Sequence, residues 1–183
     1  MRKSLLLIAV AALPAAAQQR QAAAGTPATP SSANGGVAAA KAVWMVPHNF
    51  VVRALEQTPD SLLSFKPTPD IRSLGQLFAH VADGEHLFCS LALGEPAPNP
   101  FNVVERSKST KADIVQALRE SAAHCDKAYA QTDAQAMAPA SFFGQQVNRM
   151  YLLGMNGAHD YEHYGNIVTY LRLKGITPPS SQQ

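Results

Sequence analysis

Apolar residues recur at the spacing of an α-helix in four stretches of the chain, and no stretch shows the sustained alternation of a strand. The stretches cover roughly residues 37–57, 73–93, 109–131 and 145–174. Two of the segments between them are long enough to cross a bundle rather than turn tightly. Four amphipathic helices of comparable length bury their apolar sides by packing together. The sequence therefore predicts an all-α fold, a four-helix bundle whose packing order is open.

Several residues mark the ends of these helices. Ser73 and Gln76 fit a capping box at the start of the second helix, and Gly94 suits its end. Pro47 should kink the first helix or mark a late start. The apolar stripe expected on that helix is Val43, Val46, Phe50, Val51, Ala54 and Leu55.

The first 17 residues read as a signal peptide. Arg2 and Lys3 precede a short apolar run, and Ala15 to Ala17 offer a cleavage site before Gln18. We therefore expect a periplasmic or secreted protein, with a retained N-terminal anchor as the alternative. Residues 18–36 lack bulky side chains and read as a disordered linker. The bundle is expected over 37–179, and residues 180–183 as a C-terminal tail.

Removal of the signal peptide leaves 13 basic and 13 acidic side chains. A chain with no net charge and no basic stripe is a poor partner for nucleic acid or an anionic membrane, so we expect a small-molecule ligand or substrate. A homodimer is also open. Cys89 and Cys125 pair in a disulfide or remain two separate buried thiols, since their spacing does not decide.

Two histidines lie four residues apart in the last helix. His159 and His163 are about 40° apart around the helix axis, so they point to the same side as its apolar residues. A buried imidazole is costly unless its nitrogens are satisfied. A divalent cation shared by both rings would satisfy them, and a histidine pair hydrogen-bonded to Tyr or Asn is the plainer alternative.

His80 is the best third ligand that the sequence offers. It lies on the apolar side of the second helix, whereas His86 falls on the polar side and is expected at the surface. Gly84, one turn from His80, leaves room for a ligand beside a metal or allows close helix packing.

These motifs resemble those of the DinB-like metal-binding four-helix bundles, which are unrelated to the DNA polymerase that shares the name. The resemblance rests on "LFAHVADGEHLF", on "NGAHDYEHYGNIVTYLRLKGITPP" and on the Leu171–Arg172 to Pro178–Pro179 ending. It covers residues 37–179 and implies a divalent ion, zinc or nickel, on His80, His159 and His163. Many relatives have another histidine where this chain has Glu162, and a glutamine where it has Asn166.

Three neutral imidazoles leave a coordination position open, as at catalytic metals, and the ion would acidify a water or a thiol there. We therefore expect a metal-dependent transferase or hydrolase, with a non-catalytic metal- or ligand-binding bundle as the alternative. Asp83 and Glu162 lie one turn from expected ligands and could orient an imidazole, or be ordinary surface carboxylates. The sequence assigns no catalytic residue.

Two other functions, a zinc protease and a haem-binding bundle, match fewer features of the sequence. "HDYEH" is like the His-Glu-x-x-His motif of zinc proteases, but it has Asp after the first histidine, and no Asp or Glu follows His163. Met155, His159 and Tyr170 could line a pocket for non-covalent haem, and the chain lacks a Cys-x-x-Cys-His motif for covalent attachment.

Overall fold

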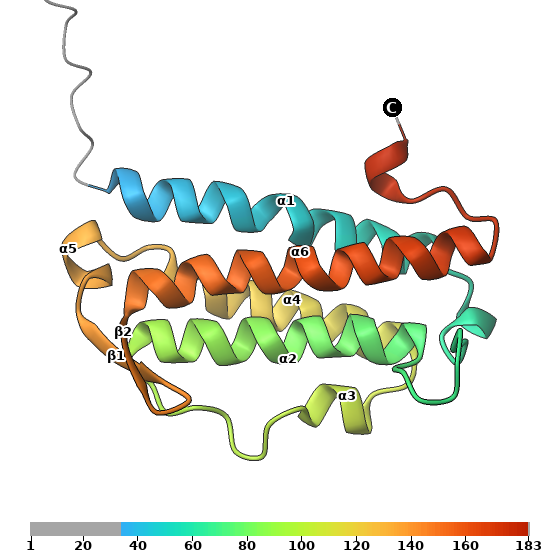
Figure 1. Ribbon diagram of the computed structural model, residues 1–183, viewed down its shortest axis with the longest axis horizontal. Coiled ribbons are helices and arrows are strands. Elements are labelled where there is room, and N and C mark those ends of the chain that lie inside the picture. Colours follow the sequence, from blue (N-terminus) through green and yellow to red (C-terminus); the bar gives the residue numbers. More distant parts are fainter. Residues whose placement is uncertain (1–33, 183) are drawn as a thin grey trace, which may run out of the picture. The chain divides into compact units, whose positions relative to one another are not determined.

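The computed structural model describes residues 34–182. The signal peptide expected at 1–17 and the linker up to residue 33 lie outside the described residues. Four long helices form the described domain: α1 (Gly35–Gln57), α2 (Leu74–Leu93), α4 (Lys111–Ala128) and α6 (Arg149–Leu173) (Figure 1). Helix α1 begins two residues before the domain boundary expected at residue 37. The four-helix bundle is thus confirmed as the main architecture.

Helices α2 and α6 form the centre of this packing. Helix α2 packs on both α4 and α6, and α6 also packs on α1. Helices α1 and α6 run in one direction, while α2 and α4 run in the other (Figure 1). The α2–α4 connector, residues 94–110, therefore runs along the bundle, and it carries the short helix α3 (Val103–Ser107). The other long connector, residues 58–73, joins α1 to α2 at one end of the bundle and does not cross it (Figure 1).

Residues 139–148 depart from the all-α prediction. Strands β1 (Pro139–Phe142) and β2 (Gln145–Asn148) form an antiparallel hairpin, and α5 (Asp133–Ala136) precedes them. Phe143 and Gly144 form the turn with φ of 48° and 80°, the backbone that a two-residue hairpin requires. Strands of four residues are too short to show a clear alternation. The last helix consequently begins at Arg149, not at residue 145, and Asn148 caps it.

The predicted ends of α2 are confirmed. Ser73 and Gln76 form the capping box, and Gly94 ends the helix with a φ of 81°. Helix α1 continues through Pro47, but the stripe expected on it is partly wrong. Trp44 and Pro47 are buried, whereas Val43 and Val46 are 53% and 43% exposed. The inward side follows residues 44, 47, 51, 54 and 55, which share one face at helical spacing.

The described chain has two further ties between its elements. A disulfide joins Cys89 of α2 to Cys125 of α4, which decides between the two alternatives for these residues. The fold also continues past the boundary expected at residue 179: a short 3₁₀ helix covers Pro179–Ser181, and the Ser180 amide donates to the Tyr164 hydroxyl.

Across residues 34–182 we find no helix with both the length and the apolar character to span a membrane.

Candidate metal centre

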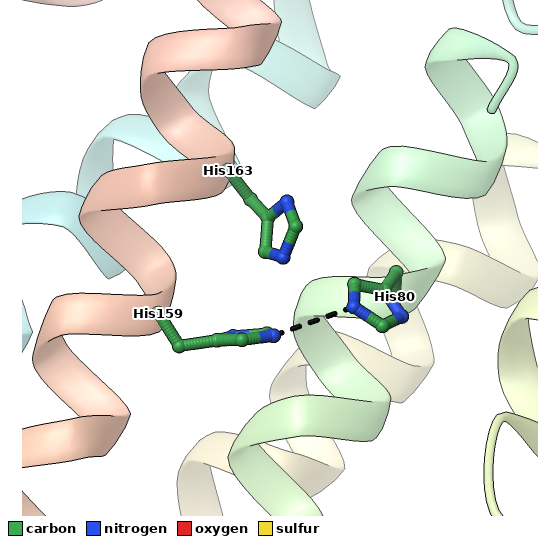
Figure 2. Close-up of side chains that lie close together, drawn as sticks. All are labelled: His80, His159 and His163. Carbon is green, nitrogen blue, oxygen red and sulfur yellow. Dashed lines mark hydrogen bonds between the residues drawn. The ribbon is translucent and has the colours of Figure 1, made fainter. Parts of the chain in front are cut away.

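His80, His159 and His163 meet between α2 and α6 (Figure 2). One nitrogen of each ring lies within 4.8 Å of the corresponding nitrogens of the other two. The Nε2 atoms of His80 and His159 are 3.4 Å apart. His159 and His163 project from successive turns of α6 toward α2, so the sequence-predicted set is brought together by the antiparallel packing of these two helices.

Gly84 makes this approach possible. A Cβ atom built on Gly84 would lie 2.2 Å from Cε1 and 2.7 Å from Nδ1 of the His159 ring. The imidazole therefore lies directly against the backbone of α2. The sequence suggested that Gly84 leaves space for a ligand beside a metal. In the structure the His159 ring occupies this space.

The three imidazoles are held in their neutral form. Burial, the neighbouring His163 and His80 rings and the Arg72 charge lower the pKa of His159 to about 3. Burial, His80 and Arg72 lower the pKa of His163 to about 4, although Glu162 acts in the opposite direction. Burial and Arg72 also lower the pKa of His80. Neutral rings offer lone pairs, which is the state that a metal requires of histidine.

Glu105, on α3, is a contributor that the sequence did not indicate. Its Oε2 lies 2.9 Å from Nδ1 of His80, and its Oε1 accepts a hydrogen bond from Nε of Arg72 at 2.8 Å. A carboxylate on Nδ1 fixes the tautomer in which Nε2 carries the lone pair. Glu105 therefore aims Nε2 of His80 at the other two rings.

Asp83 plays neither of the roles expected from its position one turn from His80. It is only 7% exposed, and its carboxylate accepts hydrogen bonds from the backbone N–H groups of Val104 and Glu105 at 3.1 and 2.8 Å. Asp83 thus holds the start of α3 against α2, and its hydrogen bonds go to this backbone and not to His80. Glu162 is exposed, as the surface alternative stated, and so is His86.

The geometry of the three rings fits a small divalent cation. Two nitrogens bound to one tetrahedral zinc ion at about 2.05 Å would be about 3.3 Å apart, close to the 3.4 Å between the His80 and His159 Nε2 atoms. Nδ1 of His159 and Nδ1 of His163 are buried without a hydrogen-bond partner among the described residues, so no described group fixes the tautomer of these two rings as Glu105 does for His80. Phe88 and Phe101 contribute apolar rings beside His159 and His80, with centroids 5.4 and 6.3 Å away.

A second polar cluster lies deeper in the bundle and differs in geometry. His48, Glu85 and Asp160 bring one ligand atom each within 4.8 Å of the others, and both acids are fully buried. Nδ1 of His48 and Oε1 of Glu85 are 2.6 Å apart, which is a hydrogen-bond distance and too short for two ligands of one ion. Trp44 and Ser121 also donate to Glu85. Glu85 and its three partners thus form a hydrogen-bonded network, and Asp160 lies beside it.

Asp160 lies beside that network and has no hydrogen bond to it. Neither of its carboxyl oxygens has a hydrogen-bond partner among the described side chains and backbone, and Nδ1 of His159 is 3.6 Å from Oδ1. Burial and the negative charge of Glu85 raise the pKa of Asp160 well above its ordinary value, so the protonated carboxyl is favoured.

Comparison with known proteins agrees with the fold. The family model described as the DinB superfamily matches residues 48–167, most of the described domain. The chain belongs to the DinB superfamily. No curated protein sequence gives a significant match.

Solved DinB-like structures share the fold of this chain. A DinB-like protein from Bacillus cereus has a TM-score of 0.67 at 18% identity, over 76% of this chain and 93% of its own. A DinB-like protein from Bacillus subtilis has a TM-score of 0.60 at 20% identity, over 82% of this chain and 99% of its own. At these identities the likeness concerns the fold alone.

The mycothiol-dependent maleylpyruvate isomerase is a further structural neighbour. It has a TM-score of 0.61 at 16% identity, and the match covers 72% of this chain but only 60% of the isomerase. The DinB-type bundle is thus also found in an enzyme whose name states a dependence on a thiol.

Proposed function

We propose that this DinB superfamily protein binds one divalent metal ion, zinc or nickel, through His80, His159 and His163 and is a metal-dependent transferase or hydrolase. The observation that carries the proposal is the convergence of three neutral imidazoles at the spacing of co-ligands. A divalent ion held there would acidify a water or a thiol at its open position.

The residues of the chain have distinct roles in this proposal. Glu105 holds His80 in the correct tautomer, and Asp83 holds the helix that carries Glu105. Gly84 gives His159 its place. Phe88 and Phe101 reduce the polarity around the rings, which strengthens charge interactions at the site.

A thiol is the first co-substrate to test. The support is the printed name of the isomerase neighbour, which describes a mycothiol-dependent enzyme on the same fold. The alternative is a bundle that binds a metal or a small ligand without turnover. A loaded protein that takes up metal but catalyses neither thiol transfer nor ester hydrolysis would favour this alternative.

Elemental analysis of the purified protein tests metal binding. We expect about one divalent ion per chain for the wild type and for His86→Ala, and a loss of most of it for His159→Ala, since a structural or catalytic ion needs its full ligand set. Equal metal content in wild type and His159→Ala would refute the proposal. His86 is the matched control because it is an exposed histidine on α2 outside the three-histidine cluster.

We also propose that the protein is exported to the periplasm or secreted. The support is the signal-like sequence of residues 1–17 and the disulfide between Cys89 and Cys125, because disulfides persist in oxidising compartments. Fractionation of a producing cell, with N-terminal sequencing of the exported form, tests this. We expect a chain that begins at Gln18, and a full-length cytosolic protein would contradict export.

A further inference from the structure

Arg72 occupies a distinctive place beside the metal centre. Its Nε donates to Oε1 of Glu105 at 2.8 Å, and the other oxygen of Glu105 lies 2.9 Å from Nδ1 of His80. Its backbone carbonyl accepts a hydrogen bond from the Tyr170 hydroxyl of α6 at 2.8 Å. Arg72 is therefore held between α3 and α6, and Glu105 alone separates its side chain from His80.

Most of the hydrogen-bonding capacity of Arg72 is unused. A guanidinium carries five N–H donors, and among residues 34–182 only the Nε group has a hydrogen-bond partner. The side chain is 38% exposed, whereas that of Glu105 is 12% exposed. The two Nη groups are therefore free to bind a ligand.

The charges around the centre favour an anionic ligand. Three neutral imidazoles leave both charges of a divalent ion uncompensated. Arg72 offsets one of the two negative charges of Glu105 and Asp83, so a divalent ion leaves an excess of positive charge among these groups. The further carboxylate of Glu162 is exposed, and solvent screens its charge. Arg72 is linked to the cluster by contacts: its Nε donates to Glu105, and Glu105 in turn lies against Nδ1 of His80.

We propose that Arg72 recognises a carboxylate on the molecule that occupies the open position of the metal, through its free Nη groups. The inference rests on the proposed metal centre and narrows its substrate class to small molecules that carry a metal-binding group and a carboxylate. A planar guanidinium suits a carboxylate because it donates two parallel hydrogen bonds.

Binding of two thiols of equal length to the cobalt-loaded protein tests this inference without any assay of activity. The probes are 3-mercaptopropionate, which carries a carboxylate, and 3-mercapto-1-propanol, which is neutral. Each is titrated while the thiolate-to-cobalt absorption is followed. We expect the wild type to bind the carboxylate thiol about tenfold more tightly, as charge-assisted hydrogen bonds contribute.

Variants identify the residue responsible. In Arg72→Gln the ratio of the two thiol affinities should fall to about one. The ratio is compared within each variant, because Arg72 also holds Glu105 and its loss affects the binding of both thiols alike. Arg72→Lys should keep part of the preference because it keeps the charge but not the planar fork. Arg119→Gln, an exposed arginine on α4, is the matched control and should behave as wild type.

The outcomes separate this inference from the proposed function. Equal affinity for the two thiols in the wild type, or a preference that survives in Arg72→Gln, would overturn the role of Arg72 and leave the metal centre in place. If neither thiol changed the cobalt spectrum, the open position itself would be refuted, and the role of Arg72 with it.

Discussion

Replacement of Gly84 by alanine should remove metal binding while the bundle still folds. The added Cβ would lie 2.2 Å from Cε1 of His159, whereas ordinary contacts begin near 3.4 Å. The ring must therefore retreat by about 1.2 Å, since carbon atoms do not approach more closely without a large repulsive cost. Metal–ligand distances tolerate deviations of only about 0.2 Å.

The expected loss follows from this mismatch. Mutations that only disturb the support of a ligand cost about 10- to 100-fold in metal affinity, so displacement of the ligand itself should cost at least about 100-fold. The fold should survive because the obstructing group is a side chain that can rotate away. Alanine gains roughly 0.5–1 kcal/mol over glycine within a helix, against about 1–3 kcal/mol for overpacking.

The assay is a competition titration of the metal-free protein against a chromophoric chelator, with thermal melting of the same samples. Gly154→Ala and Gly165→Ala are matched controls on α6, because a Cβ at either position would meet nothing within 4 Å. Both controls should bind metal as the wild type does and melt slightly higher. If Gly84→Ala bound zinc as tightly as the wild type, the close packing of His159 against Gly84 would not be required for metal binding.

Three further predictions follow from the same centre. Glu105→Gln should weaken metal binding about 10- to 100-fold, whereas Glu120→Gln, on the exposed side of α4, should not, as competition titration will show. Removal of the metal by a strong chelator should lower the melting temperature, because an ion that binds only the native state stabilises it; an unchanged melting temperature with the metal confirmed gone would count against this. The metal-free protein should lose stability as pH falls from 6.5 toward 3. In the folded state the pKa values of His159 and His163 are about 3 and 4, whereas the unfolded value is 6.5. The unfolded chain therefore takes up protons first, and protonation favours unfolding. This contribution is fully present above pH 6.5, and His159→Gln should reduce the acid-side slope of stability in melts between pH 4 and 7.

The sequence predicted most of the fold because helix ends and apolar periodicity are local signals. Ser73, Gln76 and Gly94 mark the ends of α2 correctly, since capping depends on residues a few positions apart. The β1–β2 hairpin was missed because its strands are only four residues long and its turn, Phe143–Gly144, lacks the usual Asn-Gly or Asp-Gly signal.

The candidate site was only partly predictable because some of its residues are brought together by the fold and not by their spacing in the sequence. His159 and His163 share one helix, so their common direction follows from their spacing. Glu105 lies 25 residues from His80 on a five-residue helix, and no local pattern indicates that the connector returns to the site. The burial of Glu85 and Asp160 was also missed, because charged residues are rarely fully buried and nothing local marks these two.

X-ray absorption at the metal edge of the purified protein tests the central claim most directly. We expect nitrogen ligands at about 2.0–2.1 Å from the metal. In the wild type the scattering from atoms beyond the ligands should correspond to three imidazole rings. In His163→Ala, the metal that is still bound should show the scattering of two rings. A metal surrounded only by oxygen or sulfur ligands, or a spectrum that is the same in His163→Ala, would contradict a centre built on His80, His159 and His163.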